Sequence, residues 1–239
     1  LNESGVKITA EPSDSWEGRG GASVGEELIL AKDLMGTVLR HHVEVIEELE
    51  GSSLVGRSYN PLFPGAIDGS KNPAAWTIVG AEFVTTTDGT GVVHTAVMYG
   101  EDDYNLGMKE GFPAQHTVGI DGKFISGTHS KLDGRYVKEC DSDIIDLLAS
   151  QTSLYREHTY THDYPHCWRT DYPLLYYAMD SWFVRMTAVK EQILQYNSEV
   201  EWAPSWTGEK RMGEWLSNIK DWAISRERYW GTPIPVWIC

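Results

Sequence analysis

The chain has 239 residues, of which 41% are hydrophobic and 23% charged, so its composition is that of an ordinary globular protein with one large domain or two small ones. Its net charge of −15 argues against a broad nucleic-acid-binding surface, but a small site for the end of an RNA is compatible with it. Three widely spaced cysteines suit a reducing cytoplasm, and neither a membrane-spanning run nor a signal peptide is expected.

The first half of the chain predicts short elements separated by turns. Apolar residues at helical spacing predict a helix over residues 27–41, and a strand is predicted over 43–49. β-Branched and aromatic residues predict strands over 76–84 and 92–97. The dipeptide Asp88-Gly89 between them is a strong turn signal, so these two strands are predicted to form a hairpin.

Helices are predicted with more support further along the chain. Residues 102–110 begin with an acidic turn, and residues 141–151 combine a capping residue with an apolar face. From residue 155 onward the composition becomes rich in tryptophan and tyrosine, which indicates a second structural region. Two amphipathic patterns there predict helices over 176–196 and 211–223, with Trp182 and Trp222 packed in a core.

Three strings carry a family resemblance. The first is Gly89–His94 (GTGVVH) followed by Gly100–Tyr104 (GEDDY). The second is Tyr164–Leu174 (YPHCWRTDYPL) with Ser181–Phe183, and the third lies within Trp215–Trp237 and includes DWAISR and YWGTPIP. In order and spacing they resemble the class I aminoacyl-tRNA synthetases that edit their products, those specific for isoleucine, valine and leucine.

Two further strings favour the isoleucyl-tRNA synthetase family within this group. Trp202-Ala203-Pro204 and Gly213–Leu216 (GEWL) are more similar to the isoleucine enzymes than to the valine enzymes. The resemblance implies an α+β chain: a β-barrel-like editing domain with peripheral helices over residues 1–155. A helical and loop-rich segment over 156–239 would then return to the Rossmann-type catalytic domain of class I enzymes.

Several motifs of the family are missing from this chain. The two adenylate-forming signatures, His-Ile-Gly-His and Lys-Met-Ser-Lys-Ser, are absent, so we expect no amino-acid activation from this piece. The threonine-rich peptide of the editing domain is not reproduced either, and Thr85-Thr86-Thr87 lies beside the predicted hairpin rather than upstream of it. The resemblance therefore implies that the chain begins just after that peptide.

The function implied by the resemblance is editing, the hydrolysis of valine that has been mischarged on isoleucine tRNA. A pocket that binds isoleucine cannot strongly reject the smaller valine, so a second site removes the wrong product. The implied partners are the 3′ end of isoleucine tRNA and its misacylated valine. Editing needs no metal or cofactor, whereas the full-length enzyme uses ATP and magnesium. A cytoplasmic monomer without membrane contact is expected.

Two alternatives stay open at this point. The chain is also compatible with a binding or structural module without activity of its own, which the missing threonine-rich peptide favours. It is also compatible with the equivalent region of a valyl-tRNA synthetase, which removes threonine.

The resemblance assigns Asp103 to the anchor of the substrate α-amino group, since a carboxylate binds an ammonium group through charge-assisted hydrogen bonds. Asp102 is assigned to the substrate site beside it, and Glu101 adds a third negative charge. The competing interpretation is an acidic first turn of a helix that is merely solvated.

His94 is assigned to the wall of the editing pocket, where it would exclude the larger side chain and orient water, or act as a general base. It could equally be a histidine that packs at the end of a sheet. Gly89, Thr90 and Gly91 are assigned to contacts with the terminal adenosine of the tRNA, because glycine permits close backbone approach. Simple turn chemistry explains the two glycines equally well.

Cys167 lies where some relatives have half of a zinc site, but Thr170 replaces the second cysteine. Cys167 and the adjacent His166 are too few for a tetrahedral site, so we interpret both as structural. Cys239 could begin a cysteine pair, and the segment around Trp230 resembles a part of the catalytic domain near the adenylate.

Overall fold

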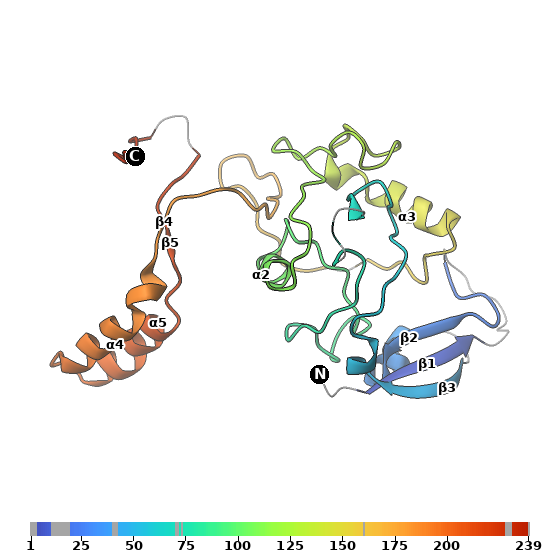
Figure 1. Cartoon of the computed structure of the whole chain (residues 1–239), viewed down its shortest axis with the longest axis horizontal. Coiled ribbons are helices and arrows are strands. Elements are labelled where there is room, and N and C mark those ends of the chain that lie inside the picture. Colours follow the sequence, from blue (N-terminus) through green and yellow to red (C-terminus); the bar gives the residue numbers. More distant parts are fainter. Residues whose placement is uncertain are drawn as a thin grey trace. The chain divides into compact units, whose positions relative to one another are not determined.

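The structure is a computed structural model that divides into two compact units, Leu1–Ala178 and Met179–Cys239 (Figure 1). The residues that it describes are 4–10, 20–39, 43–69, 72, 74–159, 161–227 and 231–238. Trp230 and Cys239, both singled out in the sequence, lie outside these residues. Among them, no helix is both long enough and apolar enough to cross a membrane.

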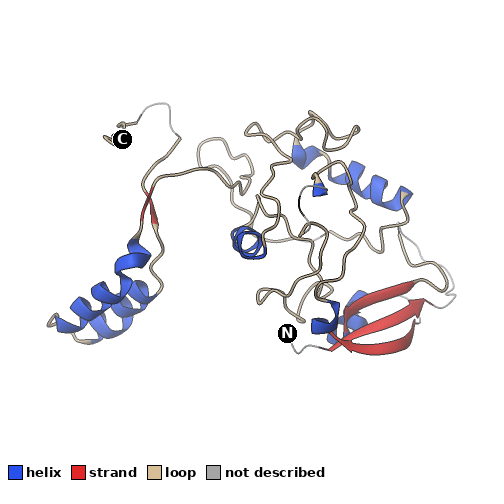
Figure 2. Ribbon diagram, in the orientation of Figure 1, coloured by secondary structure: helices blue, strands red, loops and turns tan. Residues whose placement is uncertain are grey.

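The first unit begins with a small antiparallel sheet (Figure 2). Strand β1 (Ser4–Ala10) lies in the middle, between β2 (Glu27–Ala31) and β3 (Val43–Glu50). The register of β1 against β3 shifts between Lys7 and Ile8. Ion pairs of 2.6 Å join Lys7 of β1 to Glu27 of β2 and Lys32, which follows β2, to Glu48 of β3.

The predicted helix over residues 27–41 is wrong at its start. Residues 27–31 form β2, and only a 3-10 turn (Lys32–Leu34) and the short helix α1 (Met35–Val38) follow. These residues form a strand instead of a helix because they pair with β1, and this pairing buries Leu30 on one face of the sheet. The apolar residues that pack against Leu30 are Leu28, Met35, Val38, Leu39 and Val43. The strand predicted over 43–49 is confirmed as β3.

Both helices predicted in the middle of the chain are confirmed, but the capping side chain predicted at the start of the second is wrong, because no described side chain there forms a capping hydrogen bond. Helix α2 spans Glu101–Glu110 and ends at Gly111, which adopts the left-handed conformation typical of a helix C-terminus. Helix α3 spans Asp141–Ser150 and follows a 3-10 turn at Val137–Glu139. The α3 face packs into a second core around Leu147. The residues of this core are Leu132, Cys140 and Leu147, with Phe63, Phe124 and Ile144 against them.

The hairpin predicted over residues 76–84 and 92–97 is absent from this part of the structure. Residues 76–78 instead bond to the segment that follows a 3-10 turn at Gly51–Leu54. The amide of Ile78 donates to the carbonyl of Arg57 and that of Tyr59 to Trp76, both at 2.9 Å. The mixed α and β class is confirmed, and the described strands of this unit form one open sheet of three.

The second unit combines a two-stranded ribbon with short helices. Strand β4 (Phe183–Val184) pairs antiparallel with β5 (Trp222–Ala223). A 3-10 turn at Met186–Val189 leads into α4 (Lys190–Glu199). A π-helical segment at Thr207–Met212 then runs directly into α5 (Gly213–Ser217).

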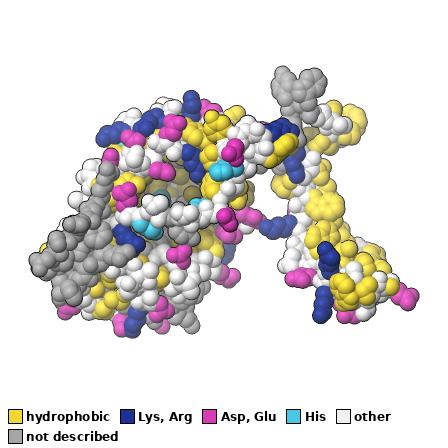
Figure 3. Space-filling model, turned by 180° about the vertical axis from the view of Figure 1, so that it is seen from behind, with side chains coloured by type: hydrophobic (Ala, Val, Ile, Leu, Met, Phe, Trp, Pro, Cys, Tyr) yellow, Lys and Arg dark blue, Asp and Glu magenta, His cyan; other side chains and the backbone are white. Residues whose placement is uncertain are grey.

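Both helices predicted in this region are too long. The first begins only at Lys190, and the second ends at Ser217. The residues around Trp182 and Trp222 have helical spacing but pair as strands, and Ile224 N–H donates to the carbonyl of Trp182 at 2.8 Å. Trp182 and Trp222 lie on this ribbon and are 49% and 48% exposed, so their predicted place in a helical core is wrong. Figure 3 shows hydrophobic side chains over much of the surface of this unit.

Described residues at both ends of the segment 156–178 form hydrogen bonds with earlier residues of the first unit. Arg156 Nη1 donates to the carbonyl of Thr37 at 3.1 Å, and Ala178 N–H donates to the carbonyl of Met98 at 2.9 Å. The predicted domain boundary between residues 155 and 156 separates an editing from a catalytic region. The two compact units of the structure do not show which residues belong to an editing region, so this boundary stays a prediction.

The second core gives a first prediction. Replacing Leu147 with alanine removes apolar contacts at a site that is 6% exposed, and we expect a loss of about 2–5 kcal/mol in the free energy of unfolding. Leu174→Ala, at a site that is 45% exposed, is the matched control and should cost less than about 1 kcal/mol. Urea denaturation measures both, and equal losses would contradict the assignment of this core.

The second unit gives a prediction about pH. Asp221 accepts hydrogen bonds from Thr187 N–H and Oγ1–H at 2.9 and 2.8 Å, and these donors lower its pKa below the ordinary value of 3.8. The ionised carboxylate therefore stabilises the fold above its ordinary pKa, and this contribution is lost as the pH falls through the lowered pKa.

We expect Asp221→Asn to unfold at a lower temperature than the unchanged chain at neutral pH, with the difference closing in strong acid. Thermal unfolding followed by circular dichroism from neutral pH down to about 2 measures this. Glu201→Gln, which makes the same charge change at an exposed site, is the control. A difference that persists unchanged in acid would show that the charge of Asp221 is not responsible.

Candidate functional site

The turn at Asp88–Val92 is held by its own side chains. Asp88 Oδ1 accepts the N–H of Gly89 at 2.8 Å, and Thr90 Oγ1 both donates to the carbonyl of Val92 and accepts its N–H. Gly89 and Gly91 have φ angles of +70° and +77°, which side chains disfavour. The glycines of the first string thus satisfy the backbone geometry of this turn.

The same turn is attached to the sheet through β2. Ala31 N–H donates to the carbonyl of Thr90 at 2.9 Å. A Cβ atom on Gly91 would lie 2.6 Å from the Cβ of Ala31, whereas one on Gly89 would meet no atom within 4 Å. Gly91 therefore has a packing role against β2, and Gly89 alone borders open space.

His94 lies in the irregular segment between this turn and α2, where the sequence predicted a strand. Its side chain is exposed. The histidine is therefore not packed at the end of a regular strand, and its ring is accessible to a ligand. Whether it forms a pocket wall stays a prediction.

The acidic residues of the first string form the first turn of α2. Gly100 precedes the helix with an extended backbone, and Glu101, Asp102 and Asp103 follow. Glu101 and Asp102 are exposed, but Asp103 is partly buried, and a Cβ atom on Gly100 would collide with its carboxylate. The positive end of the helix dipole favours all three negative charges.

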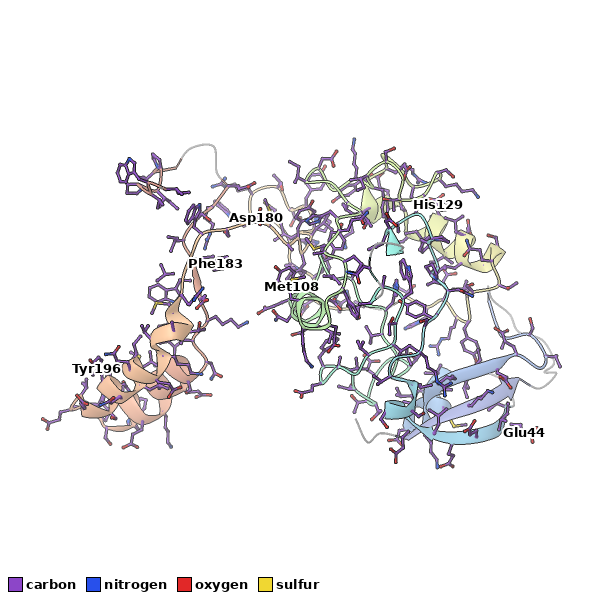
Figure 4. The ribbon with its side chains drawn as sticks, viewed as in Figure 1. Glu44, Met108, His129, Asp180, Phe183 and Tyr196 are labelled. Carbon is purple, nitrogen blue, oxygen red and sulfur yellow. The ribbon has the colours of Figure 1, made fainter. Side chains whose placement is uncertain are left out.

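The structure joins the turn and the helix through the segment 92–100, with β2 at one end and α2 at the other. Gly107 of α2 packs against Val97, where a Cβ atom would lie 2.7 Å from Val97 Cγ1. Among the described residues, neither a hydrogen bond nor an ion pair joins His94 to Asp102 or Asp103. In Figure 4 the labelled Met108 identifies α2, which is seen end-on.

The segment around Cys167 forms a tight loop. Cys167 N–H donates to the carbonyl of Tyr172, and Asp171 N–H donates to that of Cys167, both at 2.8 Å. Hydrogen bonds from Thr170 and Arg169 lower the pKa of the Cys167 thiol. His166 Nδ1 lies 4.0 Å from Asp171 Oδ1. Among the described residues, no group of three or more His, Cys, Asp or Glu side chains could hold a metal ion.

The second unit has a separate apolar hollow of about 570 Å³, lined by Thr207, Arg211, Met212 and Trp215. None of the residues assigned to editing lies in this unit. The hollow includes part of the π-helical segment, and its apolar walls offer few polar groups to fix a ligand.

Comparison with known proteins decides the family. Residues 19–239 match the family described as tRNA synthetases class I (I, L, M and V). The chain belongs to the class I tRNA synthetase family. The resemblance seen in the three strings is thereby confirmed.

Class I relatives with high identity carry the name isoleucine–tRNA ligase. The chain is 46% identical to that of Clostridium novyi over 215 residues, which is 90% of this chain and 20% of the relative. It is 45% identical to that of Clostridium acetobutylicum and 44% identical to that of Bacillus thuringiensis, with the same coverage. The chain thus spans about a fifth of the length of the curated relatives that it matches.

An aromatic cluster next to the start of α2 was not predicted from the sequence. Tyr99 directly precedes Gly100, and its ring lies edge-on to those of His116 and Tyr177. These residues are far apart in the sequence and follow no periodic pattern. The only signal was the unusual number of tyrosines, twelve in the chain.

The contact between Gly91 and Ala31 gives a prediction with an internal control. In Gly89→Ala the only cost is a side chain on a left-handed backbone, which lowers the free energy of unfolding by about 1–2 kcal/mol. Gly91→Ala has the same backbone cost, and its new Cβ atom also overpacks against Ala31, which lowers the free energy of unfolding by about 1–3 kcal/mol more. We therefore expect Gly91→Ala to be the more destabilising in urea denaturation. Equal costs would show that the turn moves freely away from β2.

Proposed function

We propose that the first unit carries the editing region of an isoleucine-specific synthetase, which hydrolyses valine from mischarged isoleucine tRNA. Membership of the class I family and the names of the relatives support the enzyme class. The observation that carries the editing role is the partly buried carboxylate of Asp103 at the start of α2, within the string that resembles the editing motif.

The chemistry of this proposal starts from the α-amino group of the esterified valine. Asp103 would accept hydrogen bonds from the ammonium group, and Asp102 beside it would add negative charge. The ester is then held while water attacks its carbonyl carbon, the bond to the ribose oxygen breaks, and valine and free tRNA leave. Catalysis of this kind depends mainly on position, since the ester is already activated.

The turn would contribute to the binding of the terminal adenosine. Because Gly91 is packed on Ala31, we assign the close backbone approach to Gly89, with Thr90 beside it. The exposed ring of His94 would limit the size of the amino-acid side chain or orient the water. These roles refine the sequence assignment, in which both glycines were equivalent.

The remaining expectations concern the larger enzyme and belong to the proposal. They are a β-barrel-like editing fold, a return to a Rossmann-type domain, and a monomer in the cytoplasm. Isolated antiparallel bridges such as Val118↔Phe124 and Lys123↔Tyr136 support further strand-like pairing outside the sheet. ATP and magnesium would serve the full-length enzyme, since this chain lacks both adenylate-forming signatures.

Two alternatives have defined signatures. A binding module would bind a non-hydrolysable valyl-adenosine analogue but would not hydrolyse the mischarged tRNA. The equivalent region of a valine enzyme would prefer threonine esters, and its pocket would offer a partner for the threonine hydroxyl. The relatives named isoleucine–tRNA ligase favour the first proposal over this one.

The carboxylate of Asp103 gives the decisive prediction. Asp103→Asn keeps the shape of the side chain but removes its charge, and we expect deacylation of valine-charged isoleucine tRNA by this chain to fall by about 10- to 100-fold. Glu110→Gln makes the same charge change at the other end of α2 and should leave the rate unchanged. The rates are measured by release of radioactive valine with the mischarged tRNA far below KM, so that they report kcat/KM.

Binding of the analogue is measured in parallel by calorimetry. Unchanged hydrolysis by Asp103→Asn would remove the assigned role of this residue. Binding without hydrolysis by the unchanged chain would favour the binding module, and faster release of threonine than of valine would favour the valine enzyme.

A further inference from the structure

Three aromatic side chains meet beside the segment Thr117–Val118. The rings of His116 and Tyr177 stack at 4.1 Å with an interplanar angle of 9°. Tyr99 lies edge-on to both, with ring centroids at 5.8 Å from His116 and 5.9 Å from Tyr177. We call Tyr99, His116 and Tyr177 the aromatic clasp. Edge-to-face and offset-stacked rings of this kind stabilise a fixed mutual arrangement.

The two hydroxyl groups of the clasp satisfy one buried backbone segment. Tyr99 Oη accepts the N–H groups of Thr117 and Val118 at 2.7 and 2.8 Å. Tyr177 Oη donates to the carbonyl of Val118 at 3.0 Å. Val118 is only 6% exposed, so its backbone groups need these partners. Burial, with smaller effects of Tyr99 and Asp121, raises the pKa of Tyr177, so its hydroxyl keeps the proton that it donates.

Consecutive residues connect the clasp to the start of α2. The carbonyl of Met98 accepts the N–H of Ala178, the residue after Tyr177, at 2.9 Å. Tyr99 belongs to the clasp. The carbonyl of Gly100 accepts the N–H of Tyr104 at 2.9 Å, which is the first hydrogen bond of the helix. The carboxylate of Asp103 lies directly against Gly100.

We propose that Tyr99 and Tyr177 are positioning residues that fix the carboxylate of Asp103, an inference that rests on the proposed editing function. Neither tyrosine needs to touch the substrate. They hold residues 98–100, and these determine where the first turn of α2 begins. An anchor for a substrate ammonium group must be held to within a fraction of an ångström, so a looser backbone here weakens binding.

The test removes one hydroxyl at a time. Tyr177→Phe keeps the stacked ring but leaves the carbonyl of Val118 without its donor. We expect KM for the mischarged tRNA to rise on the order of tenfold with little change in kcat, because the anchor contributes equally to the ground state and the transition state. Tyr99→Phe, which removes the acceptor for two N–H groups, should raise KM in the same way.

Tyr164→Phe is the matched control. Tyr164 Oη also donates to a backbone carbonyl of the first unit, that of Leu174, at 2.7 Å, and it accepts from Lys138. In the described part of the chain its contacts do not include residues 98–100, so its loss should lower stability without changing KM. Amide hydrogen exchange of Tyr104 provides a readout that does not require catalysis: exchange should become faster in Tyr177→Phe and stay unchanged in Tyr164→Phe.

The outcomes separate this inference from the proposed function. If the unchanged chain hydrolyses the ester but Tyr177→Phe keeps its KM and the exchange rate of Tyr104, the clasp is merely structural and the inference is wrong. If the unchanged chain neither binds nor hydrolyses the substrate, the proposed function fails. The exchange rates then still decide whether the clasp orders the start of α2.

Discussion

Backbone amides and carbonyls that leave water must find hydrogen-bond partners, and over residues 55–178 the helices α2 and α3 supply only part of them. Side chains supply many of the rest. Tyr99 accepts two amides, Asp133 accepts those of Gly127 and His129, and Thr128 donates to the carbonyl of Thr117. The irregular part of the first unit is therefore ordered by individual polar side chains as well as by its core.

This constraint explains which elements the sequence could predict. Helices α2 and α3 depend on local features, an acidic first turn and an apolar face, and a local pattern is sufficient to find them. Strand β2 and the ribbon of β4 and β5 depend on partners that are distant in the sequence. Residues 27–31 have helical spacing, but pairing with β1 makes them a strand, and the same conflict arises around Trp182.

The candidate site was predictable to a similar extent. The strings that resemble the family lead directly to Asp103, His94 and the glycine turn, and the structure confirms the helix that begins at Glu101. The difference between Gly89 and Gly91 could not be predicted, because it depends on Ala31, sixty residues earlier in the chain. The hydrogen bond of Tyr177 could not be predicted either, since its partner Val118 is fifty-nine residues away in the sequence.

The contact between Gly91 and Ala31 also limits how this region can vary among relatives. Position 91 accepts only glycine as long as position 31 carries a Cβ atom at this distance, and a side chain at position 91 would push the turn off the sheet. The amide of Ala31 would then lose the carbonyl of Thr90. A side chain at position 91 therefore requires that position 31 lose its own Cβ atom, so a residue of the edge strand β2 restricts the composition of a turn sixty residues later in the sequence.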